Sequence, residues 1–318
     1  MISNTYAAVD LGSNACRLLI CNEEGCTLLM ENYSTRLAEG MYETGCITEQ
    51  AFGRGREAFV KIKNNLEKFG VEKQNLRAVA TAACRMAKNG NDFINEMEKV
   101  SGIRLEIIDG REEAELNLQG AAVHVRGKSK YLLIWDVGGG SSEVTLAENK
   151  DIPQIIKTIS IPYGARNGAE EFDLHEYDAT KAKKLQDKIN EYMDAFLDIE
   201  MPKLKDICFV ATSSTALRLE AIIEGRTNYV REDEDGHIIT RSAMNSTIND
   251  LFDKSVAEMA KHPCIGETRA PIFLAAVVIF AQIAQRLNAD NITASLKSAK
   301  DAIVANLIER DKKNGKAN

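Results

Sequence analysis

The 318-residue sequence lacks several features that would assign a protein to a class at once. Its longest apolar run, residues 271–281, falls well short of the roughly 20 residues that a transmembrane helix needs, and it is expected to form a buried helix. No basic segment followed by an apolar stretch opens the chain, so nothing indicates secretion. We therefore expect a cytoplasmic protein with no membrane partner.

Paired cysteines and excess positive charge are also missing. The seven cysteines are odd in number and lack paired CxxC spacing, which predicts neither a zinc site nor a disulfide framework. The four histidines show no ligand spacing either, and we expect them to be peripheral. A net charge of −7 gives no basic footprint for duplex nucleic acid. A polyanionic substrate would need a local basic patch that works against the overall field.

The most informative stretch is YLLIWDVGGGSSEVTL, residues 131–146. An apolar strand runs into Asp136, and a polar turn follows: Gly138, Gly139, Gly140 and Ser141. Successive backbone N–H groups in a glycine turn form a concave anion site. A carboxylate beside that site is compatible with phosphate only if a cation mediates. Taken alone, the stretch fits either a metal–phosphate site or an ordinary glycine-rich hairpin.

A second copy of this pattern lies at the N-terminus, in TYAAVDLGSNACRLLIC. Asp10 takes the place of Asp136, and the same offset of 126 residues aligns Arg17 with Glu143. Such internal repetition predicts two similar halves that face each other across a cleft, each contributing one turn.

The length of the chain suits two domains, and strands alternate with helices, which indicates an α/β fold. We expect a first domain over residues 1–127, completed by a last helix at about 299–312, and a second domain over 128–298. Within the first domain, the apolar run 77–83 is expected to be a strand that ends just before Arg85.

Six motifs in order carry a resemblance to a known family: AVDLGSNACRLLI, RLAEG, ATAACRMA, DGREEAEL, DVGGGSSEV and SIPYGA. Over nearly its whole length the sequence resembles the exopolyphosphatase/guanosine pentaphosphate phosphohydrolase (Ppx/GppA) family. The resemblance implies two actin-like (ribonuclease H-like) α/β domains. It also implies a magnesium-dependent hydrolase that releases terminal orthophosphate from inorganic polyphosphate or guanosine pentaphosphate.

The resemblance also implies roles for single residues. Glu113 would activate the attacking water, and Arg85 would bind phosphate with its guanidinium fork. Asp136 and Glu143, with Asp10 from the other half, are the candidates for holding Mg²⁺. The full set of expected phosphate-binding residues is Ser13, Asn14, Arg17, Arg85, Gly138, Gly139, Gly140 and Ser141.

Two of these assignments have structural alternatives. Glu113 and its neighbours Glu112 and Glu115 are acids of the kind that is favourable at any helix N-terminus. Glu143 could instead form a cross-strand salt bridge with Arg17 or Lys157.

The sequence also departs from the family pattern. Ser214 stands where the family has a glycine, and residues 296–303 lack the usual glycines and arginine but carry Lys297 and Lys300. We therefore expect an active hydrolase whose site is altered where it binds the distal part of the substrate. The alternatives are a non-catalytic regulatory protein that binds polyphosphate or an alarmone, and a kinase that uses ATP. The oligomeric state stays open, with a homodimer as one option.

Overall fold

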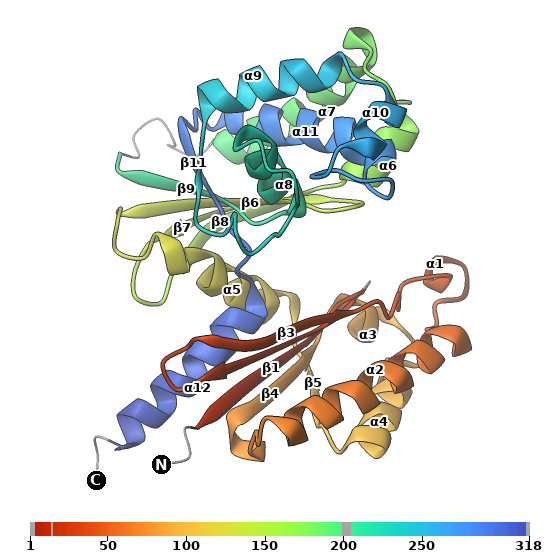
Figure 1. The fold of residues 1–318 in the computed structure, drawn as a ribbon, viewed down its shortest axis with the longest axis vertical. Coiled ribbons are helices and arrows are strands. Elements are labelled where there is room, and N and C mark those ends of the chain that lie inside the picture. The colour runs from red at the N-terminus through yellow and green to blue at the C-terminus, as the bar shows by residue number, and fades with distance from the viewer. Residues whose placement is uncertain (1–3, 14, 199–204, 316–318) are drawn as a thin grey trace. The chain divides into compact units, whose positions relative to one another are not determined.

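The computed structural model describes residues 4–13, 15–198 and 205–315 (Figure 1). The chain forms two compact units, one comprising Met1–Gly120 and Ser298–Asn318, the other Ala121–Lys297. Each unit is built on one β-sheet with helices packed against it (Figure 1). The expected α/β class is therefore confirmed.

The sheet of the first unit has the strand order β3-β2-β1-β4-β5. Its strands are β1 (Thr5–Leu11), β2 (Cys16–Asn22), β3 (Thr27–Tyr33), β4 (Leu76–Ala80) and β5 (Leu105–Ile107). The first three strands are antiparallel, whereas β4 and β5 run parallel to β1. The helical segments are α1 (Met41–Thr44), α2 (Glu49–Lys68), η1 (Lys73–Asn75), α3 (Ala82–Met86), α4 (Gly90–Ser101), α5 (Gly110–Ala121) and α12 (Ala299–Gly315).

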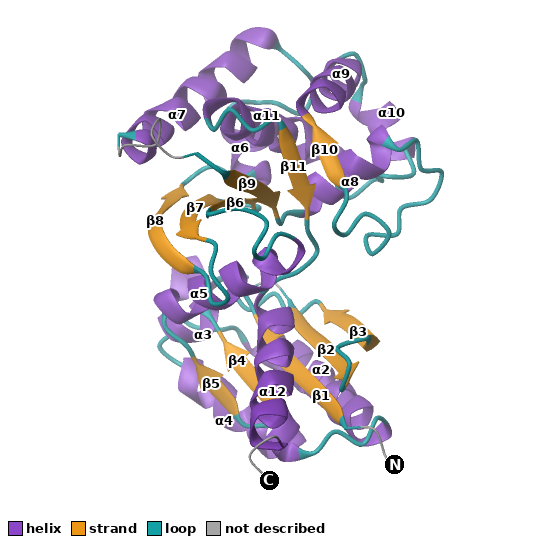
Figure 2. Cartoon of the chain, turned by 90° about the vertical axis from the view of Figure 1, so that its left-hand side faces the viewer, coloured by secondary structure: helices purple, strands orange, loops and turns teal. Residues whose placement is uncertain are grey.

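The last helix of the chain belongs to the first unit. Figure 2 shows α12 lying across the sheet, and its Ile303 and Leu307 pack in one cluster with Tyr6 of β1 and Leu19 of β2. The helix continues to Gly315, past the expected end at residue 312.

The expected strand 77–83 is wrong in its second half. Strand β4 ends at Ala80, and residues 82–86 form helix α3, so Arg85 lies on a helix. The Arg85 amide donates to the carbonyl of Thr81 at 3.1 Å, which closes the helical turn. The local reason is composition, since alanine is the strongest helix former and two alanines follow Thr81.

The second unit repeats the strand order of the first. Its sheet has the order β10-β11-β9-β6-β7-β8. The strands are β6 (Tyr131–Val137), β7 (Ser142–Glu148), β8 (Gln154–Ile161), β9 (Ile207–Ala211), β10 (Ile238–Thr240) and β11 (Asn291–Ala294). Strands β8, β7, β6, β9 and β11 match β3, β2, β1, β4 and β5 in order and direction, and β10 is an addition at the edge.

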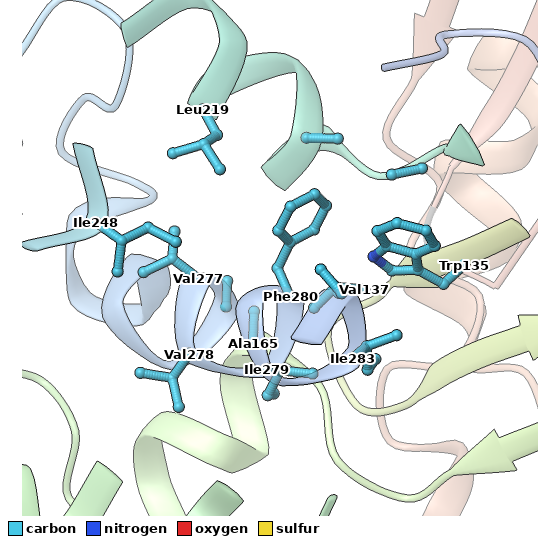
Figure 3. Packing of buried hydrophobic residues seen from close by; sticks show 14 of the residues in the cluster. Trp135, Val137, Ala165, Leu219, Ile248, Val277, Val278, Ile279, Phe280 and Ile283 are labelled. Atoms are coloured by element: carbon cyan, nitrogen blue, oxygen red, sulfur yellow. The ribbon is translucent and has the colours of Figure 1, made fainter. Parts of the chain in front are cut away.

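The helices of the second unit cover this sheet. They are η2 (Ala122–His124), α6 (Ala165–Glu171), α7 (Ala179–Leu197), α8 (Ser214–Ile223), α9 (Arg241–Phe252), α10 (Val256–Lys261) and α11 (Ala270–Arg286). Figure 3 shows α11 at the centre of the core, with Phe280 against Trp135 of β6 at a ring distance of 5.5 Å. A helix that is apolar on nearly all sides is buried in this way. Within the described ranges, no helix is both long and apolar enough to cross a membrane.

The sequence repeat is also a structural repeat. Asp10 lies opposite Arg17 in hairpin β1–β2, and Asp136 lies opposite Glu143 in hairpin β6–β7. In both turns the first glycine donates its amide to a carbonyl three residues ahead at 2.9 Å, Gly12 to Ala15 and Gly138 to Ser141. The predicted duplication of the hairpin is confirmed down to the hydrogen bond that closes each turn.

Candidate active site

Glu113 lies in the first turn of α5, just beyond the end of β5. The turn before this helix is fixed to the sheet, because the Ile108 amide donates to the carbonyl of Ala80 at 3.1 Å. Asp109 then caps the helix, with its Oδ1 accepting from the Glu112 amide at 2.8 Å. The backbone that carries Glu113 is therefore held at both the strand and the helix end.

The three glutamates of this turn have different partners. Glu112 accepts from Arg77 Nη2 at 2.5 Å, and Glu115 accepts from Arg111 Nε at 2.9 Å. Glu113 Oε2 instead accepts from both Nη1 and Nη2 of Arg85, each at 3.2 Å. Glu112 and Glu115 fit the alternative of acids that are simply favourable near a helix N-terminus. Glu113 differs, because it contacts Arg85, an expected phosphate-binding residue.

Arg85 is itself held in place by the backbone. Its Nη1 donates to the carbonyl of Ile108 at 2.7 Å in addition to its contact with Glu113. The side chain remains 31% exposed, so its guanidinium group is accessible to an anion. The structure thus brings together the expected base and the expected phosphate-binding arginine.

Partial burial changes the chemistry of Glu113. Desolvation raises the pKa of its carboxyl group above the ordinary value, and the nearby charge of Asp10 raises it further. The hydrogen bonds and charge of Arg85, together with a hydrogen bond from Thr81, act in the opposite direction. A carboxylate with a raised pKa is a better proton acceptor, which suits a general base.

This raised pKa predicts how Glu113→Gln changes stability with pH. Ionisation of Glu113 is less favourable in the folded than in the unfolded chain, so it lowers the stability of the folded protein. This destabilisation is absent at low pH and develops as the pH rises through the pKa that Glu113 has in the folded protein. Thermal unfolding of the variant and the parent from pH 4 to pH 8 should therefore show a midpoint difference that grows in favour of the variant. Glu112→Gln, which loses a contact to Arg77, should show no such gain, and a pH-independent difference for Glu113→Gln would contradict the prediction.

Asp10 and Arg17 are partners of one another. Arg17 Nη1 donates to Asp10 Oδ2 at 3.0 Å, and the Asp10 side chain is 7% exposed against 44% for Arg17. The pair therefore compensates a nearly buried carboxylate at the end of β1. In the same turn the Ser13 carbonyl accepts from the Ala38 amide at 3.0 Å. Asn14, the neighbouring candidate, lies outside the described residues.

The carbonyl groups of the glycine turn in the second unit all bond to the start of α6. The amide of Ala165 donates to Gly138 O at 2.8 Å, and the amide of Arg166 donates to Gly139 O at 2.7 Å. The side-chain Nδ2 of Asn167 donates to Gly140 O at 3.0 Å. In a trans peptide the N–H points opposite to the C=O of the same unit. The next amides, those of Gly139, Gly140 and Ser141, therefore point away from α6.

These amides are candidates for binding an anion. Among the hydrogen bonds between described residues, none has the amide of Gly139 or Gly140 as its donor, and both glycines are exposed. A Cβ added at either glycine would meet no atom within 4 Å, so packing does not require glycine there. Glycine at these positions is compatible with the close approach of a ligand to the backbone that an anion site of N–H groups requires.

Gly164 holds the glycine turn in place, a role that the sequence did not indicate. A Cβ at Gly164 would lie 2.6 Å from Gly138 O and 2.7 Å from both Gly139 C and Gly140 N. Its backbone is extended, so the requirement for glycine is one of space. Asn167 supports the same contact, because its Oδ1 accepts from the Gly164 amide at 2.7 Å while its Nδ2 reaches Gly140.

Glu143 is oriented by hydroxyl groups. Its Oε1 accepts from Ser141 Oγ at 2.6 Å and from Ser160 Oγ at 3.1 Å. The alternative of a salt bridge with Lys157 is wrong, because Lys157 Nζ donates to the carbonyl of Ala195 at 2.7 Å and makes no ion pair with Glu143 among the described residues.

Two carboxylates of this hairpin are candidates for holding a magnesium ion. Asp136 and Glu143 lie directly opposite each other across β6 and β7. They offer two carboxylates beside the glycine turn, and oxygen ligands of this kind are those that Mg²⁺ prefers. The serine hydroxyls on Glu143 act as the outer partners that orient such a ligand.

The lysines that replace family glycines and arginine have partners within the fold. Lys297 Nζ lies 3.6 Å from Asp235 Oδ2. Lys300, which is 2% exposed, contacts Asp301 Oδ2 at 2.7 Å at the start of α12. Ser214 opens α8 directly after Ser213, whose hydroxyl caps the helix.

Solved structures share this architecture. The alignment with a Ppx/GppA family member from Aquifex aeolicus covers 96% of this chain and 98% of that one, with 21% identity and a TM-score of 0.83. An exopolyphosphatase from Cytophaga hutchinsonii, 22% identical, aligns over 96% of this chain and 98% of its own with a TM-score of 0.77. At these identities the likeness shows the fold.

The sequence comparisons agree with this result. A bifunctional 3-dehydroquinate synthase/phosphatase from Fusobacterium nucleatum is 27% identical over 265 residues, which are 79% of this chain and 39% of that protein. The chain therefore spans well under half the length of this curated relative. The model of the Ppx/GppA phosphatase family matches residues 22–310, nearly the whole chain. The resemblance seen in the six motifs is thereby confirmed, and the chain belongs to the Ppx/GppA phosphatase family.

Proposed function

We propose that this chain is a magnesium-dependent hydrolase that releases terminal orthophosphate from inorganic polyphosphate or guanosine pentaphosphate. Glu113 activates the attacking water. The observation that carries the proposal is the contrast among the three glutamates of α5, of which Glu113 alone contacts Arg85 while Glu112 and Glu115 have other partners. Membership of a phosphatase family supports the reaction class.

Hydrolysis of a phosphoanhydride needs a positioned water, charge neutralisation on the phosphoryl oxygens and in-line geometry. Glu113 accepts a proton from the water as its oxygen bonds to the terminal phosphorus. The bond from phosphorus to the bridging oxygen breaks, and its electron pair leaves with the shortened substrate. The raised pKa of Glu113 matches it to this role.

Arg85 links substrate binding to base activation. In the structure its guanidinium group bonds to Glu113 and so holds the carboxylate in an ion pair. A phosphoryl oxygen that accepts from Arg85 competes with Glu113 for the same donors. Substrate binding then leaves the carboxylate available to the water.

The second unit supplies phosphate binding. The amides of Gly139, Gly140 and Ser141 donate to phosphate oxygens, and Ser141 Oγ adds a donor beside them. Asp136 and Glu143 are the residues that would hold Mg²⁺, with Asp10 as the candidate of the first unit. Magnesium, when bound, neutralises charge on the phosphoryl oxygens.

One assay tests this proposal and the identity of the substrate. Phosphate release is measured from long polyphosphate, short polyphosphate and guanosine pentaphosphate, each with and without Mg²⁺. We expect release from at least one substrate that depends on the metal. Tight binding of a substrate without release from any of the three would overturn the proposal in favour of a regulatory binding protein.

A further inference from the structure

A second cluster of metal-ligand side chains lies in the second unit, and it shares no residue with the glycine hairpin. It consists of Glu220 on α8, Glu234 in the loop that follows α8, and His237 directly before β10 (Figure 2 labels α8 and β10). One ligand atom from each residue can be chosen so that all three lie within 4.8 Å of one another.

The distances within this cluster are those of ligands around a metal ion. His237 Nδ1 lies 3.6 Å from Glu220 Oε1 and 3.8 Å from Glu234 Oε2. Both separations exceed the length of a hydrogen bond. Tetrahedral coordination with bonds of about 2.0–2.2 Å places ligand atoms about 3.4 Å apart, close to the separations seen here.

Both carboxylates are buried, and each has an oxygen without a partner. Glu220 is 2% exposed and Glu234 is fully buried. Among the described residues, Oε2 of Glu220 and Oε2 of Glu234 have no hydrogen-bond donor. Burying an unpaired charged oxygen is costly, and two such carboxylates side by side also repel each other. A divalent cation between them would remove both penalties.

The surrounding contacts fix the ligands in place. Arg226 Nε donates to Glu234 Oε1 at 3.0 Å, which leaves the other oxygen of Glu234 to face His237. The backbone of His237 is tied to β11, because its carbonyl accepts from the Ala294 amide at 2.9 Å. Outer contacts of this kind orient metal ligands before the metal binds.

We propose that Glu220, Glu234 and His237 bind one divalent transition-metal ion, with Zn²⁺ as the best match. A set of two carboxylates and one imidazole nitrogen suits zinc, whereas magnesium prefers oxygen ligands alone. The two carboxylates of Glu220 and Glu234 carry two negative charges, and Arg226 supplies one positive charge. The resulting net negative charge attracts a cation. The His237 side chain is 43% exposed, so the ion reaches the cluster from the side of His237. A water molecule on that side completes the coordination. The metal fixes the loop between α8 and β10, and this role is independent of the proposed hydrolase function.

The test uses the full chain after it has been stripped of metal with a chelator. Zinc binding is measured by competition with a fluorescent chelator, and bound zinc is counted after dialysis. We expect one zinc per chain, and we expect Glu220→Gln and His237→Gln to weaken binding at least about tenfold. Glu224→Gln, an exposed glutamate four residues along from Glu220, and Asp136→Asn in the hairpin should bind zinc like the parent.

Two further readouts identify the ligands and guard against misfolding. Co²⁺ bound in place of zinc should give a spectrum without a thiolate charge-transfer band, since the three proposed ligands include no cysteine. Zinc should raise the unfolding midpoint of the parent and of Glu224→Gln but leave that of Glu220→Gln unchanged. Absence of zinc binding by the parent, parent-like binding by Glu220→Gln, or a thiolate band would each overturn the proposal.

Discussion

Replacing Glu113 by glutamine is expected to lower kcat for phosphate release by about 10²–10⁴-fold, the usual contribution of a positioned general base. The amide keeps the shape of the side chain and can still accept from Arg85, whose two nitrogens lie 3.2 Å from Glu113 Oε2. It cannot take a proton from water at neutral pH. The effect should therefore fall on kcat, while substrate binding measured at equilibrium stays close to that of the parent. Steady-state kinetics and a binding titration of the same variant provide the two measurements.

Glu112→Gln is the matched control for this experiment. It makes the same chemical change one residue away, on a side chain that bonds to Arg77. We expect activity within a small factor of the parent. In the parent, loss of kcat/KM on the acid side should occur above the ordinary carboxyl pKa, because burial raises the pKa of Glu113. Full activity of Glu113→Gln, or an equal loss in Glu112→Gln, would reject Glu113 as the base.

Gly164→Ala is expected to lower kcat/KM by about 10²-fold, the loss that a displacement of about 1 Å can cause in a catalytic site. The added methyl group would lie 2.6 Å from Gly138 O, and these backbone atoms cannot move aside without shifting the whole turn. The amides of Gly139 and Gly140 would then no longer converge on the phosphate. The loss should appear chiefly as weaker substrate binding, which steady-state kinetics and a titration with the substrate distinguish from a loss of kcat.

Gly168→Ala, on the same helix α6, is the control for this change. A methyl group there would lie 3.4 Å from Cδ1 of Ile279, which is ordinary van der Waals contact. Alanine also favours the helix over glycine by up to about 1 kcal/mol. We expect this variant to unfold at the same or a higher temperature and to keep its activity. Equal activity of the two variants would show that the position of the glycine turn does not depend on Gly164.

Local patterns in the sequence were sufficient to predict the two hairpins. Alternation of apolar residues, followed by an aspartate and a glycine turn, has a direct structural cause, and Asp10 and Asp136 lie where the pattern puts them. The strand that was expected up to residue 83 failed because alanines fit both a strand and a helix, and Arg85 came to lie on α3.

Features that depend on contacts between distant segments were not visible in the sequence. The motif around Gly164 was noted, but its contact with Gly138 joins segments more than 20 residues apart and leaves no periodic signal. Glu220, Glu234 and His237 match no standard ligand spacing, and only the packing of α8 against the loop before β10 brings them together. The partners of Glu112 and Glu115, which separate them from Glu113, likewise required the coordinates.

The position of α12 has a consequence for the order in which the chain folds. The first unit is interrupted after Gly120 and resumes at Ser298, so the second unit is an insertion whose two ends are neighbours: a Cβ at Gly120 would lie 2.1 Å from Ser298 O. Strands β1 and β2 are synthesised long before α12, yet Tyr6 and Leu19 are covered by side chains of that helix. During synthesis the inserted unit can fold as soon as its own residues are available. The apolar face of β1 and β2 therefore stays uncovered until α12 has been synthesised.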